Sequence, residues 1–208
     1  MYLPKHFRVT DTALAQTLIR EQPLASLVTT DGAGLPFVTH LPLRLDRLEE
    51  GGTLHLLGHL ARANPQWQHL QARPRAVVTF LGPQAYLSPK VYPDLQRVPT
   101  WNYVALHATV QATLVHAGDD KDRLLKCLIA DHEPAYADQW RSLAESYTTA
   151  MLAGIVGLEL AATEWQCAVK VNQHRPEARV ALRAAYLAGN EQERALAAWM
   201  DRVAAPGT

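Results

Sequence analysis

The spacing of apolar residues along the chain predicts one helix followed by a series of short strands. Leu14, Leu18 and Ile19 recur at helical spacing behind Asp11, which predicts a helix capped by Asp11 and ended near Pro23. After this helix come short apolar runs separated by Gly-containing turns at 31–34 and 50–52. The predicted strands are 24–30, 36–45, 54–59, 76–81, 85–87 and 104–115. Short strands at this regular spacing are typical of a β-barrel or a β-sandwich.

The helical period returns in the last third of the chain. Asp119 and Asp120 are placed to begin a helix that carries Leu124, Leu125, Leu128 and Ile129, and a second helix is predicted at about 143–152. Residues 155–171 predict two paired strands or one long bent strand. Two further helices are expected at 176–188 and 191–203, separated by Gly189-Asn190. The predicted class is therefore α+β, mainly β. We expect a single domain over 1–208 with helical additions at about 119–154 and 176–203.

Composition narrows the class of protein. A hydrophobic content of 48% is that of a globular protein with a sizeable core. Lys plus Arg and Asp plus Glu both number 20, so the net charge is zero, which argues against a broad DNA-binding surface. Two cysteines are too few for a disulfide scaffold. Neither a signal peptide nor an apolar run of the ~20 residues that span a membrane is present, so we expect a cytoplasmic protein.

The stretch 54–67 is the first candidate for binding chemistry. A strand ends near Gly58, a turn carries Arg62, and Asn64-Pro65 is a helix-start signal. A helix N-terminus with an adjacent arginine can bind an anion, although an ordinary strand-to-helix connection explains the same pattern. The second candidate is the segment 88–103, which contains three prolines and several aromatic residues. A connection of this length is more often functional or part of an interface than idle.

Catalytic and metal motifs are missing from the sequence. The chain has no Ser-His-Asp order, paired-carboxylate spacing, P-loop or GxGxxG pattern, so we assign no catalytic residue. His55 and His59 face the same side of a predicted strand, but no nearby carboxylate or cysteine completes a metal site.

Several blocks of sequence together resemble one known family. They are PLASLVTTDG (23–32), PFVTHLPLRL (36–45), LLGHLARANPQW (56–67), GPQAYLSP (82–89), PTWNYVALHA (99–108) and IVGLEL (155–160), and the similarity extends to NQHRP (172–176). The chain is similar to the PaiB family, FMN-binding split-barrel proteins described as negative transcriptional regulators. More widely, it resembles the pyridoxamine phosphate oxidase-like flavoproteins. The resemblance implies an FMN-binding split β-barrel with peripheral and C-terminal helices, and a homodimer with FMN at the subunit interface.

The resemblance also implies a flavin site in three pieces. The first is the strand of Thr39, His40, Leu41 and Pro42, with Arg44 beyond it; Pro42 favours an edge strand or a bulge. The second is Leu57, Gly58, His59, Arg62 and Asn64, where Ala63 stands in place of the second cation that related proteins often have. The third is Trp101, Asn102 and Tyr103, expected to reach the flavin from the partner subunit. Ordinary strand packing and dimer-interface aromatics are the structural alternatives for these pieces.

Three functions remain open from the sequence. The first is a regulator of the PaiB type, the second a flavin-dependent oxidoreductase acting on a small molecule, and the third a haem-binding or haem-degrading split barrel. DNA binding rests on the family description, and the last two helices could form a helix-turn-helix. Glu191 and Glu193 at the start of the second of these helices would repel phosphates, whereas Arg175, Arg179 and Arg183 could form a basic stripe on the first.

Overall fold

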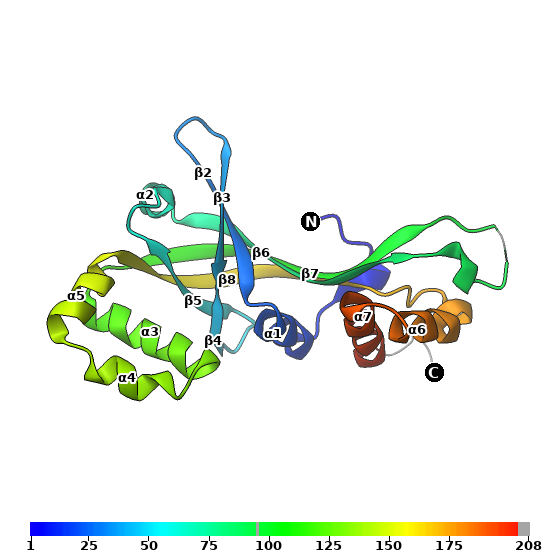
Figure 1. The fold of residues 1–208 in the computed structure, drawn as a ribbon. Coiled ribbons are helices and arrows are strands. Elements are labelled where there is room, and N and C mark those ends of the chain that lie inside the picture. The colour runs from blue at the N-terminus through cyan, green and yellow to red at the C-terminus, as the bar shows by residue number, and fades with distance from the viewer. Residues whose placement is uncertain (95, 204–208) are drawn as a thin grey trace. The chain divides into compact units, whose positions relative to one another are not determined.

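The computed structural model describes residues 1–94 and 96–203, and it divides into two compact units. The central unit comprises Pro23–Val78 and Ala108–Glu164. The terminal unit comprises Met1–Gln22, Thr79–His107 and the chain from Trp165 onward. Three long strands contribute residues to both units, so the chain crosses between them within β6, β7 and β8 (Figure 1).

Strands and helices are interspersed along the chain. The first half of the chain contains the short 3-10 helix η1 Lys5–Phe7, β1 Arg8–Val9, α1 Thr12–Glu21, β2 Leu24–Thr30, β3 Pro36–Pro42, β4 Arg44–Leu48, β5 Leu54–Ala61, α2 Gln66–Ala72 and β6 Arg75–Leu87. The second half contains η2 Pro89–Val91, β7 Thr100–Val115, α3 Gly118–His132, α4 Tyr136–Ser142, α5 Glu145–Ala153, β8 Ile155–Lys170, η3 Pro176–Ala178, α6 Arg179–Leu187 and α7 Glu191–Arg202. The fold is thus mainly β with peripheral helices, as the sequence predicted.

Strand order places β3 and β4 at the two ends of the sheet path. The order is β3-β2-β6-β7-β8-β5-β4, and β1 pairs with β8 outside this path. The β2–β3 hairpin is antiparallel, with Val28 opposite Val38, and its turn uses Gly34 at φ 85°. The Asp31 carboxylate accepts hydrogen bonds from the backbone N–H groups of Ala33 and Leu35, both at 2.8 Å. A local Asx-type turn therefore sets the hairpin register.

Each unit has its own buried apolar cluster. In the central unit Leu27, Leu56, Leu60 and Leu70 are at most 2% exposed, because alternate residues of the strands point inward. In the terminal unit α6 and α7 lie side by side (Figure 1), and Trp199 of α7 is 1% exposed. Burial of such large side chains is the main stabilising contribution in each unit.

Several predicted boundaries were correct. Helix α1 begins behind Asp11, whose side chain accepts a hydrogen bond from Ala13 N, and β2 covers the predicted residues 24–30. The second helix predicted at 143–152 corresponds to α5. The two alternatives for 155–171 resolve into a single strand, β8.

Other boundaries were wrong. The predicted strand 36–45 is interrupted at Leu43, which is 1% exposed and donates its N–H to Pro23 O at 2.8 Å. The strands predicted at 76–81 and 85–87 are one strand, β6, whose inside–outside alternation shifts at Gly82 and Pro83, both buried. A shift in the alternation of buried and exposed residues leads a sequence pattern to predict two strands, although the backbone continues as one strand through the irregularity.

The start of helix α3 and the extent of the segment 88–103 also differ from expectation. Asp119 and Asp120 lie in the first turn of α3, and the N-cap is Ala117 without a side-chain hydrogen bond. Helix α4 was not predicted. The segment 88–103 is not a loop throughout, because β7 begins at Thr100; Leu95 of this segment lies outside the described residues.

Candidate functional site

The predicted ligand-facing strand is an edge strand in the structure. β3 carries Thr39, His40, Leu41 and Pro42, and it pairs with β2 at the end of the strand path. This confirms the expectation drawn from Pro42. Leu41 points into the core at 3% exposure, while His40 is exposed and its Nδ1 lies 3.0 Å from Ser26 Oγ. The outer edge of β3 leaves backbone donors and acceptors for a ligand.

Arg44 is held by carboxylates of its own unit. Its Nε lies 2.6 Å from Asp131 Oδ2, and its Nη1 lies 3.1 Å from Asp46 Oδ1. Burial lowers the pKa of Arg44, but the hydrogen bond and charge of Asp131 outweigh this effect and raise it overall. With its charge compensated on two sides, Arg44 has little left to offer an anionic ligand.

Leu57 and Gly58 pack inside the fold. Leu57 is 6% exposed and lies opposite Arg44 in the β4–β5 ladder. A Cβ on Gly58 would stand 2.5 Å from Leu43 Cδ2 and 3.0 Å from Pro42 O. Gly58 is therefore required by the close passage of the chain around Leu43, whatever its role toward a ligand.

Asn64 joins the edge strand to the turn that follows β5. Its Nδ2 donates to Thr39 Oγ1 at 2.9 Å, and its Oδ1 accepts from Gln66 N at 2.9 Å. Asn64 Oδ1 thus satisfies the first N–H of α2, but the helix starts at Gln66 and its N-cap is Pro65, one residue later than the predicted Asn64. Because Thr39 and Asn64 satisfy each other, their role is to position β3 against this turn.

Arg62 is exposed on the same turn. Its guanidinium donates to Ile155 O at 3.2 Å and lies 5.5 Å from the ring centre of Trp67, whose Nε1 donates back to Arg62 O. No carboxylate lies within ion-pair distance of Arg62 among the described residues. Arg62 is therefore the cation of this joint whose charge remains available.

His59 precedes this turn on β5. Its Nδ1 is buried without a hydrogen-bond partner among the described residues. Burial lowers the pKa of His59 below the ordinary value of 6.5, so the ring is neutral at pH 7. A buried, unpaired ring nitrogen can hydrogen-bond a ligand.

The third predicted piece lies on β7 in the terminal unit. Trp101 is 55% exposed and its ring meets that of Tyr86 edge-on at 6.4 Å. Asn102 points to the other face of the strand, is fully buried, and donates from Nδ2 to Tyr186 Oη at 3.0 Å. Tyr103 is half-buried, with Lys170 Nζ 5.7 Å from its ring centre. The strand thus separates Asn102 from its two aromatic neighbours.

Sequence reasoning missed a buried glutamine beside the Arg62 turn. Gln66 is completely buried, and its Nε2 donates to Leu27 O at 2.9 Å and to Phe37 O at 3.0 Å. These bonds hold α2 against the β2–β3 hairpin. No sequence signal marks Gln66, because a glutamine in a first helical turn is usually exposed.

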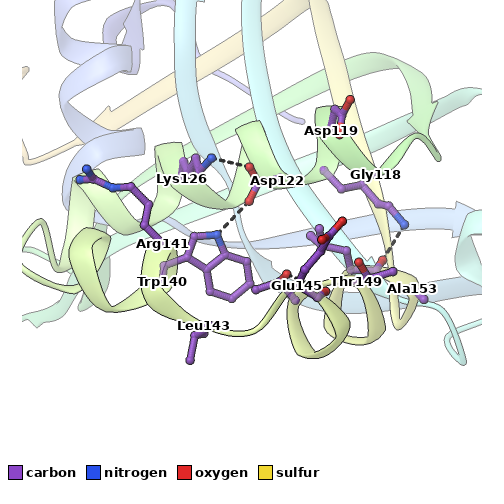
Figure 2. Close-up of a pocket in the computed structure, with 13 residues that line it drawn as sticks. Gly118, Asp119, Asp122, Lys126, Trp140, Arg141, Leu143, Glu145, Thr149 and Ala153 are labelled. Atoms are coloured by element: carbon purple, nitrogen blue, oxygen red, sulfur yellow. Dashed lines mark hydrogen bonds and ion pairs between the residues drawn. The ribbon is translucent and has the colours of Figure 1, made fainter.

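A cavity of about 520 Å³ lies among α3, α4 and α5 in the central unit. Figure 2 shows Asp122 at its wall, facing Lys126 and Trp140. The Asp122 carboxylate lies 2.5 Å from Lys126 Nζ and accepts a hydrogen bond from Trp140 Nε1 at 2.8 Å. Burial would raise the pKa of Asp122, but these two hydrogen bonds and the charge of Lys126 lower it. Lys121 Nζ donates to Leu152 O at 2.5 Å. The polar groups of this cavity hold the helices together, and the sequence reading named none of them as a site.

A second cavity, of about 370 Å³, lies within the terminal unit. Its lining residues are His6, Phe7, Tyr92, Gln96, Arg97, Val98, Thr100, Asn102, Lys170, Asn172, His174 and Arg175. Asn102 is the predicted site residue that lines it. The NQHRP block at 172–176, which contains Asn172, His174 and Arg175, carried the family resemblance but suggested no chemistry.

Metal-binding clusters and membrane-spanning helices are both absent from the described residues. Across 1–94 and 96–203, no group of three or more His, Cys, Asp or Glu side chains is arranged to hold a metal ion. None of the described helices combines the length and apolar character that crossing a membrane requires.

Known proteins share both sequence and fold with this chain. The family described as "Putative FMN-binding domain" matches residues 1–164. "Protease synthase and sporulation protein PAI 2" of Bacillus subtilis is 33% identical over 182 residues, which cover 85% of this chain and 84% of that protein. Two solved structures share the fold at low identity. The flavocytochrome Anf3 from Azotobacter vinelandii has a TM-score of 0.63 at 15% identity, covering 81% of this chain and 72% of that one. The FAD and haem binding protein from Mycobacterium smegmatis has a TM-score of 0.60 at 17% identity, covering 78% and 73%.

The sequence matches and the sheet agree with the resemblance drawn from the blocks at 23–45, 56–67 and 99–108. The family match covers both the edge strand β3 and the Arg62 turn. The chain belongs to the PaiB family of FMN-binding split-barrel proteins.

Proposed function

We propose that this chain binds FMN in the cytoplasm as a homodimer and acts as a negative transcriptional regulator of the PaiB type. The hydrogen bond from Asn64 Nδ2 to Thr39 Oγ1 carries the proposal for the flavin site. This bond joins the free edge of β3 to the turn that carries Arg62. A flavin needs both features, since its ring presents alternating donors and acceptors and its phosphate needs a cation.

Arg62 carries most of the charge in this site. α2 is short, and its first N–H, that of Gln66, already donates to Asn64 Oδ1, so the helix contributes little to phosphate binding. Arg44 is compensated by Asp131 and Asp46. His59 Nδ1 adds a neutral hydrogen-bonding group. We therefore expect moderate affinity, set chiefly by one arginine.

Substitution of Arg62 tests the proposed site. Arg62→Ala should weaken FMN binding by about 1.5–3 kcal/mol, the scale of a charge-assisted hydrogen bond. Arg62→Lys should recover part of the loss, because it keeps the charge but not the forked geometry. Arg75→Ala, which removes an exposed arginine at the start of β6, is the matched control. Flavin fluorescence quenching gives the three affinities; equal affinities for Arg62→Ala and the parent would remove Arg62 from the site.

The spectrum of the isolated protein distinguishes the bound group. A flavin gives absorption near that of free FMN, and chromatography of the released flavin separates FMN from FAD. A Soret band would instead indicate bound haem and would favour the haem-binding alternative over FMN binding. Consumption of NAD(P)H by the FMN-loaded protein would add an oxidoreductase activity to the flavin binding.

A further inference from the structure

The cavity within the terminal unit contains two buried amide groups with unused hydrogen-bonding capacity. Asn102 is 0% exposed and Asn172 is 4% exposed. Asn102 Oδ1 and Asn172 Nδ2 have no partner among the described residues. A buried polar atom without a partner costs free energy of about 1–3 kcal/mol, so such atoms usually face a ligand or ordered water.

The orientation of Asn102 follows from its neighbours. Burial raises the pKa of Tyr186 to about 12, so its phenol keeps its proton. That hydroxyl faces Tyr86 O at 3.5 Å and can donate to it, while it accepts from Asn102 Nδ2 at 3.0 Å. The unpaired atom of Asn102 is therefore its carbonyl oxygen, which accepts a hydrogen bond.

Asn172 presents the opposite group. Tyr92 Oη donates to Asn172 Oδ1 at 2.9 Å, which leaves the amide Nδ2 as a free donor. The backbone of Asn172 is left-handed, with φ 64°, and its C=O accepts from Arg175 N at 3.0 Å. Asparagine tolerates this conformation better than other side chains do. The turn thus fixes Asn172 on the cavity wall.

The charge of the cavity wall is positive. Lys170, Arg97 and Arg175 line it, and its described lining contains no Asp or Glu. Arg97 is compensated by Asp94 at 2.7 Å and Glu177 at 3.4 Å. Lys170 is half-buried, and its Nζ donates to Thr100 Oγ1 at 2.8 Å. No carboxylate forms an ion pair with Lys170 among the described residues.

The same wall is partly aromatic. Phe7 and Tyr92 line the cavity, and Lys170 Nζ lies 5.8 Å from the centre of the Phe7 ring. Its volume of about 370 Å³ is within the ~300–1,000 Å³ of small-molecule pockets. The wall supplies the charges of Lys170 and Arg175, neither of which forms an ion pair among the described residues. Its unpaired polar atoms are the donors Asn172 Nδ2 and Arg97 Nε and the acceptor Asn102 Oδ1.

We propose that this cavity binds a small aromatic anion, with its carboxylate or phosphate on Lys170 and Asn172 and its ring against Phe7 and Tyr92. A further N–H or O–H group of the ligand would donate to Asn102 Oδ1. The cavity lies in the terminal unit and its lining does not include Arg62 or the other flavin contacts predicted in the central unit; Asn102 is the predicted flavin contact that it shares. The inference therefore does not depend on FMN binding.

Matched probes separate charge from shape. Benzoate and phenyl phosphate carry the two candidate head groups, and benzamide has the same ring without the charge. Calorimetric titration of the full chain, with and without saturating FMN, should show saturable binding of one or both anions. Benzamide should bind at least tenfold more weakly. Binding of benzamide equal to that of the anions would overturn the proposal, and so would loss of anion binding on FMN saturation, which would make the cavity part of the flavin site.

Variants test the role of Lys170. Lys170→Met should weaken anion binding at least tenfold, whereas Lys170→Arg should stay within about threefold of the parent. Lys126→Met removes the same charge from α3, outside the cavity, and should leave binding unchanged. If Lys170→Met does not fold, magnetisation transfer from benzoate to the Phe7 and Tyr92 rings of the parent decides the matter. No transfer, or no effect of Lys170→Met, would refute the site.

Discussion

At the scale of single residues, the flavin-site candidates divide into groups that are free and groups that the fold already uses. Arg62 and the Nδ1 atom of His59 keep unused binding capacity. Thr39 and Asn64 bond to each other, and Arg44 is paired with carboxylates. Family resemblance alone marks all of these as flavin contacts. Their contacts show which are able to bind a ligand and which position the others.

Gly58 is the residue whose structural role is easiest to test. Gly58→Ala should destabilise the protein by about 1–3 kcal/mol, because the new methyl group meets Leu43 and the carbonyl of Pro42. Gly32→Ala is the control, since an added Cβ there meets nothing within 4 Å. Denaturant unfolding measures both. Equal stability of the Gly58→Ala and Gly32→Ala proteins would show that the structure accommodates a methyl group at this position of β5.

At the scale of elements, the helices α7 and α3 both have acidic residues in their first turn, but only α7 has a side-chain cap. α7 begins with a capping box, in which Asn190 Oδ1 accepts from Glu193 N at 3.0 Å and Glu193 Oε2 accepts from Asn190 N at 2.8 Å. α3 begins without any side-chain cap, although Asp119 and Asp120 lie in its first turn. Glu193 is thus committed to its own helix and is not displayed as part of a recognition surface.

Removing the cap of α7 should have a measurable cost. Asn190→Ala should lower the free energy of unfolding by about 1 kcal/mol, because Glu193 N then loses its partner. Asp119→Ala removes a first-turn acid that caps nothing, so we expect a loss of at most a few tenths of a kcal/mol. Urea denaturation of the two variants compares them directly. A larger loss for Asp119→Ala would mean that the charge at a helix start outweighs the cap.

At the scale of the whole molecule, the exposed apolar side chains bear on assembly. In the terminal unit Leu81, Tyr86 and Trp101 of β6 and β7 are 49–55% exposed. In the central unit Val38 and Val77 of β3 and β6 are 49% and 39% exposed. Strand faces of this kind are costly in water and are usually covered in an oligomer.

We expect a homodimer with an interface above about 2,000 Å² in total, the size of obligate dimers. Multi-angle light scattering should give twice the chain mass of 23.0 kDa. Trp101→Lys should shift the protein toward monomer and weaken FMN binding at the same time. A stable monomer of the parent protein that binds FMN normally would defeat this expectation.

DNA binding is expected to be weak and largely insensitive to sequence. Arg175 precedes α6, so the stripe predicted on one helix with Arg179 and Arg183 is not continuous. Arg183 is paired with Asp201 at 2.8 Å, and Arg179 donates to Met200 O at the end of α7. Even three free charges would give a salt slope of only about −3.

A gel shift at about 150 mM salt, with a promoter duplex and a scrambled duplex, tests this expectation. Both duplexes should bind weakly and alike. Asp201→Ala, which frees Arg183, should strengthen binding to both by a similar factor. Selective nanomolar binding of the promoter by the parent would show that another surface reads DNA, and would give the regulator proposal a direct mechanism.

The sequence by itself determined the features that depend on neighbouring residues. The helix start at Asp11 and the strand 24–30 follow from periodicity and capping chemistry, which act over a few positions. The blocks of sequence from 23–32 to 155–160 together identified the family, and the sequence matches confirm it. Edge placement of β3 also followed, because Pro42 cannot donate to a ladder.

Only the tertiary structure decided which polar groups are free. Arg44 meets Asp131 from 87 positions away, Lys170 meets Thr100 from 70, and Asn102 meets Tyr186 from 84. Local pattern carries no information about such pairs, since folding brings together segments that are remote along the chain. The interruption at Leu43 and the continuous β6 have the same origin: packing against distant strands, rather than local propensity, sets where these strands bend and end.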